Sequence, residues 1–147
     1  MLTDPSYIFL YMFSKLFQTS CIKVTFEDVQ YAIRHKDQFI LINTLSLGEQ
    51  DCLLPNTVSY QVEEKYINEL LNQYDLKSRK IIIYGKHTTD DTAEKKYKQM
   101  QTLGFDVYLY VGGMFEWMLL QDIYGKEEFP TTCTVIDILK FKPGRVF

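Results

Sequence analysis

The chain has 147 residues, 46% apolar and 24% charged, which is enough for one domain with a substantial core and excludes a disordered chain. Its 16 Lys and Arg residues against 19 Asp and Glu residues give a net charge of −3. Proteins that bind nucleic acid through its phosphates are basic, so we expect no nucleic-acid partner.

Three cysteines, Cys21, Cys52 and Cys133, are far apart and odd in number. This pattern predicts neither a disulfide framework nor a metal site with closely spaced ligands, and the two histidines, His35 and His87, lie on different predicted elements. We therefore expect no metal, no cofactor, and a reducing, intracellular location such as the cytoplasm.

The first 20 residues form a predicted N-terminal extension whose apolar run covers residues 7–13. The run is too short for a membrane span, and Asp4 before it does not fit a signal peptide. Apolar residues near helical spacing predict a helix that either docks on the domain or binds a partner. The aromatic residues that would contact such a partner are Tyr7, Phe9, Tyr11, Phe13 and Phe17.

The main body alternates short apolar runs with amphipathic segments. The runs 22–24, 39–42, 58–60, 81–84 and 107–110 predict strands. Thr25 with Asp28 predicts the start of a first helix, and an Asp91/Glu94 pair predicts a later helix that ends at Gly104.

Two further helices complete this pattern. One has Val62, Tyr66, Leu70 and Tyr74 on its apolar face, and the other covers residues 114–123 and ends at Gly125. Repeated β-then-α units predict an α/β domain over residues 21–127, with a doubly wound, mainly parallel, five-stranded sheet and helices on both faces. Residues 128–147 form a C-terminal extension that either packs back or contacts a neighbour.

The order of motifs in the second half resembles a rhodanese-like domain. It consists of IIIYG at 81–85, a polar loop, a helix ending in LGF at 103–105, and VYLYVGGMFEW at 107–117. Upstream, FILINTL at 39–45 is similar to the family strand that usually ends in Asp-x-Arg, and LLPNT at 53–57 is similar to its Ile-Pro-Gly-Ala turn. The resemblance covers roughly residues 21–125.

The resemblance also identifies where the family's chemistry is missing. Members that transfer sulfur place a cysteine where the IIIY-type strand ends, and Gly85 stands at that position. A residue without a side chain cannot act as the nucleophile, and a shifted loop would bring His87 or Thr89 there instead, neither of which is a thiol. Asn43 and Leu45 replace the Asp-x-Arg pair.

The remaining loop is a degenerate binding site made of Gly85, Lys86, His87, Thr88, Thr89 and Asp90. A helix N-terminus attracts anions, but Asp90 and Asp91 stand at this terminus, where carboxylates are expected to cap the helix and repel an anionic substrate. Lys86 and His87 oppose this effect in part.

We therefore interpret the sequence as an inactive rhodanese-like protein that acts as an interaction or structural module. Its YGK, GGMFEWxLLQDIYG and FPTT segments are similar to forms from protists and large DNA viruses, so a component of a virion or another assembly is one expectation. Two alternatives stay open: a divergent sulfurtransferase that uses Cys52, and an anion-sensing module that uses Lys86 and His87.

Overall fold

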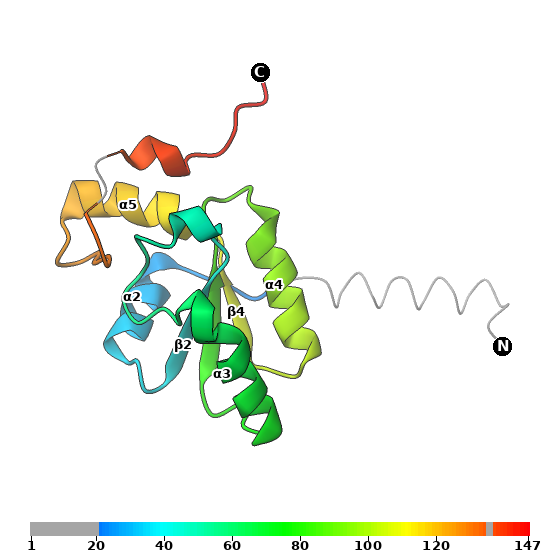
Figure 1. Ribbon diagram of the computed structural model, residues 1–147. Coiled ribbons are helices and arrows are strands. Elements are labelled where there is room, and N and C mark those ends of the chain that lie inside the picture. Colours follow the sequence, from blue (N-terminus) through cyan, green and yellow to red (C-terminus); the bar gives the residue numbers. More distant parts are fainter. Residues whose placement is uncertain (1–20, 135–136) are drawn as a thin grey trace, which may run out of the picture.

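A four-stranded parallel sheet forms the centre of the molecule (Figure 1), in the computed structural model that describes residues 21–134 and 137–147. The strand order is β1–β4–β3–β2, with bounds β1 (Lys23–Val24), β2 (Phe39–Asn43), β3 (Lys80–Tyr84) and β4 (Val107–Tyr110). This confirms the predicted α/β class with a parallel sheet. The expected fifth strand is reduced to one parallel bridge between Thr57 and Leu41, because Ser59 already caps the next helix.

Two helices cover each face of the sheet (Figure 1). α2 (Phe26–Arg34) and α5 (Gly113–Tyr124) lie on one face, and α3 (Tyr60–Asn72) and α4 (Asp91–Thr102) lie on the other. Alternate residues of β3 point to opposite faces, so Ile82 and Tyr84 join the α2/α5 core while Ile81 and Ile83 join the α3/α4 core. Burial on both faces explains why β3 is continuously apolar after Lys80.

The helix ends follow capping chemistry. Thr25 and Asp28 form the predicted capping box of α2. α4 ends at Thr102, and Gly104 just beyond it has a φ of 101°, with backbone bonds from Gly104 N to Gln101 O and from Phe105 N to Met100 O. α3 ends in the same hydrogen-bond pattern, but there Tyr74, with a φ of 54°, holds the position that favours glycine.

The buried face of α3 differs from the predicted one. Ile67 and Leu70 are buried, whereas Val62 is 52% exposed and Tyr74 is 89% exposed. Tyr74 lies beyond Asn72, the last residue of α3, so helical spacing does not place it on this face. Val62, in the first turn, lies about 80° around the helix from Leu70. Only Leu70, near the middle of the series, is buried in the core.

The chain after α5 packs back onto the same domain. Phe129 lies against Trp117, with ring centroids 5.0 Å apart, and Phe141 in the short helix η2 (Ile138–Phe141) is buried in the α2/α5 core. The other short helix, η1 (Leu47–Glu49), follows β2. No helix within the described residues is long and apolar enough to cross a membrane.

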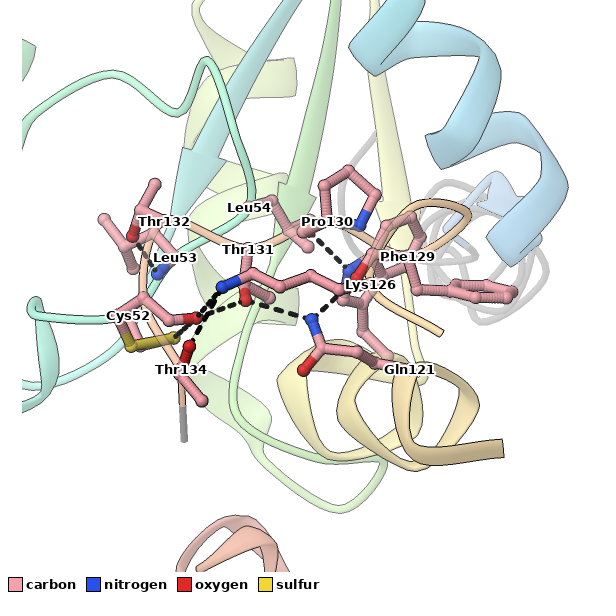
Figure 2. Close-up of a disulfide and its surroundings, with 12 residues drawn as sticks. Cys52, Leu53, Leu54, Gln121, Lys126, Phe129, Pro130, Thr131, Thr132 and Thr134 are labelled. Atoms are coloured by element: carbon pink, nitrogen blue, oxygen red, sulfur yellow. Dashed lines mark hydrogen bonds between the residues drawn. A yellow bond between two sulfur atoms is a disulfide. The ribbon is translucent and has the colours of Figure 1, made fainter. Parts of the chain in front are cut away.

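A disulfide joins Cys52, in the loop after β2, to Cys133, after α5 (Figure 2), with Cα atoms 5.1 Å apart. The expectation of no disulfide is therefore wrong for this pair. The two residues are separated by 81 positions, and only the return of the chain across α5 brings them together. The cysteine count consequently no longer supports a reducing location.

The left-handed backbone conformation of Tyr74 can be tested by substitution. Replacing Tyr74 by Gly should raise the free energy of unfolding by about 0.5–1 kcal/mol, because the strain of a side chain at this φ exceeds the entropy that Gly adds to the unfolded chain. Urea denaturation measures the change. Gln73→Gly is the matched control: its φ is −88°, so that substitution should lower stability. A loss of stability in Tyr74→Gly would contradict this account.

Candidate functional site

The candidate loop, residues 85–90, follows β3 at the carboxyl ends of the central strands, where open parallel sheets usually bind ligands. The six predicted residues are consecutive, and the structure turns the last of them, Asp90, back onto the first two. The Asp90 side chain thereby fills the inside of the loop, as its hydrogen bonds show.

Asp90 is the N-cap of α4. One carboxylate oxygen, Oδ1, accepts hydrogen bonds from Thr92 N at 3.0 Å and Thr92 Oγ1 at 2.7 Å, while Oδ2 accepts from Lys86 N at 3.1 Å. Burial disfavours the charge, but the hydrogen bonds from Thr92 and Lys86 outweigh it and hold the pKa of Asp90 below its ordinary value. The amides of Lys86 and Thr92 are thus bound to a carboxylate of the chain itself.

Gly85 is buried beneath this carboxylate. A Cβ atom there would lie 2.9 Å from Asp90 Oδ2, 3.1 Å from Thr44 Oγ1 and 3.2 Å from the Cβ of Ala93. The nearest of these atoms is fixed by the hydrogen bond from Lys86 N, so it cannot move away without loss. The position has no room for a side chain as the loop stands.

The start of α5 holds the other side of the loop. Met114 N donates to Gly85 O at 3.0 Å, and Phe115 N donates to Lys86 O at 2.9 Å. Gly113 permits this approach because its φ is 64° and because a Cβ there would lie 2.7 Å from Gly85 O. Gly113, at the start of α5, therefore has a local structural role: it lets the loop backbone bind directly to the helix.

The Lys86 side chain contacts two residues that are distant in the sequence. Its ammonium lies 2.7 Å from a carboxylate oxygen of Glu49 in η1 and 6.0 Å from the ring centre of Phe141. Burial opposes the charge of Glu49, but hydrogen bonds from Lys86 and Ser46 outweigh it and hold the pKa of Glu49 below its ordinary value. The positive charge of Lys86 is thus already paired.

The rest of the loop is polar and open. His87 Nδ1 lies 3.2 Å from Thr89 Oγ1, and Thr88 and Thr89 are exposed. His87 and Thr89 therefore bond to each other on the outside of the loop, and Asp90 is the loop side chain that bonds back to the backbone of Lys86. The predicted opposition of Lys86 to the acidic residues is weakened by its pairing with Glu49.

Asn43, which the resemblance places at the Asp of Asp-x-Arg, forms a neutral amide pair with Gln50, and Leu45 is buried in the core. Asn43 Nδ2 donates to Gln50 Oε1 at 3.1 Å, and Gln50 Nε2 donates to Asn43 Oδ1 at 2.8 Å. Asn43 Oδ1 also accepts from Leu45 N at 3.0 Å. Gln50 carried no signal in the sequence, because its role depends on the turn that brings η1 back to the end of β2.

A cleft of about 330 Å³ opens beside the loop on the α4 side. Charges of both signs line it, with Lys23 on one wall and Glu94 on another, together with the free Cys21. Burial raises the pKa of the Cys21 thiol, and the negative charge of Glu94 raises it further, so Cys21 is a weak nucleophile at neutral pH. No group of three His, Cys, Asp or Glu side chains in the described part of the chain could hold a metal ion.

Two other predicted features lie elsewhere. Cys52 is buried and bonded to Cys133, so it is not a free thiol in this structure. The predicted N-terminal helix and its candidate contact residues, Tyr7, Phe9, Tyr11, Phe13 and Phe17, lie outside the described residues.

Solved structures from bacteria and yeast share this arrangement. A Bacillus halodurans protein has a TM-score of 0.56 at 20% identity, over 79% of this chain and 82% of that one. A Lactobacillus plantarum protein has a TM-score of 0.53 at 9% identity, over 79% and 94%. A Saccharomyces cerevisiae protein, described as a homolog of single-domain rhodanese and Cdc25 phosphatase catalytic domain, has a TM-score of 0.54 at 11% identity, over 80% and 90%.

The fold is rhodanese-like. At these identities the likeness shows the fold alone, and no protein-family model and no curated protein matches the sequence. The resemblance carried by the IIIYG, LGF and VGGMFEW motifs is thus confirmed for the fold, because those motifs form β3, the end of α4, and β4 with the start of α5.

A double-mutant cycle can test whether the Asp90 side chain fills the space beside Gly85. Gly85→Ala should lower the free energy of unfolding by about 1–2 kcal/mol, because the added Cβ overpacks the loop against Asp90. Asp90→Ser keeps an N-cap oxygen but is shorter, so the same Ala should cost less in that background. Urea denaturation of the four proteins gives the coupling. Equal costs in both backgrounds would show that Asp90 does not fill the space.

The Lys86–Glu49 pair predicts a pH dependence. Because the pKa of Glu49 is lowered on folding, its ionised form stabilises the protein above its ordinary pKa, and this contribution disappears as the pH falls through the folded value. Between about pH 7 and about pH 3, wild type should therefore lose more stability than Glu49→Gln. Glu64→Gln, on the exposed side of α3, is the control and should follow wild type. Parallel curves for Glu49→Gln and wild type would contradict the prediction.

Proposed function

We propose that this chain is a catalytically inactive rhodanese-like protein that serves as an interaction or structural module in a larger assembly, such as a virion. One observation carries the proposal: the loop after β3 contains Gly85 and an inward-turned Asp90 where the resemblance places a sulfur-carrying cysteine. The similarity of the YGK and GGMFEWxLLQDIYG segments to protist and viral forms supports the assembly role.

Inactivity in sulfur transfer follows from the chemistry of the loop. The reaction needs a thiolate that accepts and releases a sulfur atom, and residues 85–90 contain no thiol. The Asp90 carboxylate also uses the amide of Lys86 and repels anions such as thiosulfate or phosphate. This arrangement disfavours the anion-sensing alternative as well.

The alternative that uses another thiol is weaker on this structure. Cys52 is joined to Cys133, so it would have to be reduced before it could accept sulfur. Cys21 lines the cleft beside the loop, but its raised pKa keeps the thiol protonated at neutral pH. A divergent sulfurtransferase would therefore need conditions that change one of these two cysteines.

Exposed apolar side chains near the C-terminal end support an interaction role. They lie on α5 and on the segment that includes η2, two elements that pack against each other (Figure 1). Large apolar side chains that stay exposed on these two elements are available for contact with another protein. The residues are Leu119, Ile123, Tyr124, Leu139, Val146 and Phe147.

Inactivity is tested by incubating the full chain with thiosulfate and cyanide, with an active rhodanese as the positive control. We expect no thiocyanate above background and no gain of one sulfur atom in the mass of the protein. The same measurement after reduction, in wild type and in Cys21→Ser, covers the two cysteine alternatives. A persulfide on any cysteine, with turnover, would contradict inactivity.

The interaction role is tested by cross-linking lysines in the native source and identifying the links by mass spectrometry. We expect links to other chains from the two extensions, at Lys15, Lys140 and Lys142. Lysines on the exposed side of the α3/α4 layer, Lys65 and Lys95, are the internal controls and should give fewer. Links confined to a single chain would remove the interaction proposal while leaving inactivity untouched.

A further inference from the structure

The chain after α5 forms a strap, residues 126–134, that is fastened over Trp117. Trp117 Nε1 donates to Pro130 O at 2.9 Å, and Gln121 Nε2 donates to Phe129 O at 2.7 Å and to Thr131 Oγ1 at 3.0 Å (Figure 2). Trp117 is fully buried, and Phe129 is 3% exposed. The strap therefore covers apolar core surface of α5.

The far end of the strap is held beside the disulfide by two hydrogen bonds. Thr132 N donates to Leu53 O at 2.9 Å, and Leu53 N donates to Thr132 Oγ1 at 3.0 Å. Leu53 and Thr132 are the direct neighbours of Cys52 and Cys133 (Figure 2). These bonds do not involve sulfur, so they are available to bring the two cysteines together before the S–S bond forms.

The last described segment depends on the same anchor. Within the described residues, the hydrogen bonds of segment 137–147 are formed inside that segment, as from Leu139 N to Asp137 Oδ1. Its attachment to the domain comes from the packing of Ile138 and Phe141 and from the contact of Phe141 with Lys86. Cys133 is thus the last covalent anchor before a segment that is held by packing.

We propose that the Cys52–Cys133 disulfide is a redox lock on this strap. When the bond is closed, the strap cannot lift from Trp117 without breaking a covalent bond. When the bond is open, the strap is held by its hydrogen bonds and by Phe129 alone, and it opens locally while the sheet stays folded. The lock does not depend on the proposed interaction role or on inactivity of the loop.

The exchange reaction needs a dithiol reductant. One reductant thiolate attacks the sulfur of Cys133, which is less buried than Cys52; the S–S bond breaks, and Cys52 leaves as a thiolate that takes up a proton. The second thiol of the reductant, as a thiolate, then attacks the mixed disulfide, releasing Cys133 and leaving the reductant as a cyclic disulfide. An oxidised dithiol reverses the sequence and closes the lock.

The fold should strongly favour the closed form. Folding and disulfide formation are linked equilibria. If the disulfide raises the folding equilibrium constant by some factor, folding raises the equilibrium constant for forming the disulfide by the same factor. For two cysteines 81 residues apart, chain entropy gives a factor on the order of 10³. The lock should therefore close in the native chain at a thiol–disulfide ratio at which the denatured chain stays reduced.

Trp117 is the only tryptophan of the chain, so its fluorescence reports the strap. The experiment uses the full chain carrying Cys21→Ser, equilibrated in oxidised or reduced dithiothreitol, and measures acrylamide quenching of Trp117. We expect slow quenching in the oxidised protein and faster quenching in the reduced protein, with unchanged far-ultraviolet circular dichroism. Cys21→Ser/Cys52→Ser is the matched control and should behave as reduced in both buffers.

Three results would overturn the lock. Equal quenching in the oxidised and reduced protein would show that the bond does not control the strap. Loss of helical circular dichroism on reduction would show that it supports the whole fold. Alkylation of Cys52 and Cys133 in the oxidised buffer would show that the bond does not form.

Discussion

The Asp90 carboxylate inside the loop after β3 determines the character of the site. It binds the amide of Lys86 and caps α4 through Thr92, so these two donors are already occupied. Gly85 beneath it has no room for a Cβ. The loop that follows β3, an inner strand of the sheet, thus places a carboxylate directly against the position of Gly85.

The surrounding elements hold the loop in this state. Hydrogen bonds from Met114 N and Phe115 N fix its backbone against α5, and Glu49 pairs with Lys86. Phe141 covers Lys86 from the C-terminal side. The Cys52–Cys133 bond joins the loop that carries Glu49 to the chain that leads to Phe141. The C-terminal extension therefore contributes a side chain that contacts the site.

Local chemistry made most of the fold predictable from the sequence. The Thr25 capping box and the stop of α4 before Gly104 depend on residues within a few positions of one another. The Asp90 cap was predictable for the same reason. The Glu49–Lys86 pair, the Asn43–Gln50 pair and the disulfide were not, because each depends on how distant loops meet in space. The α3 face was misjudged because the helix ends at Asn72, before Tyr74, and because Val62 lies about 80° around the helix from Leu70.

The most direct test of this account is a titration of the isotopically labelled full chain with thiosulfate, observed through backbone amide resonances. If the Asp90 carboxylate occupies the loop, the amide signals of Lys86 and Thr92 will not move at thiosulfate concentrations that leave the rest of the spectrum unchanged. Saturable shifts confined to Lys86, Thr92 and their loop neighbours would contradict the account, because they would show a functioning anion cradle.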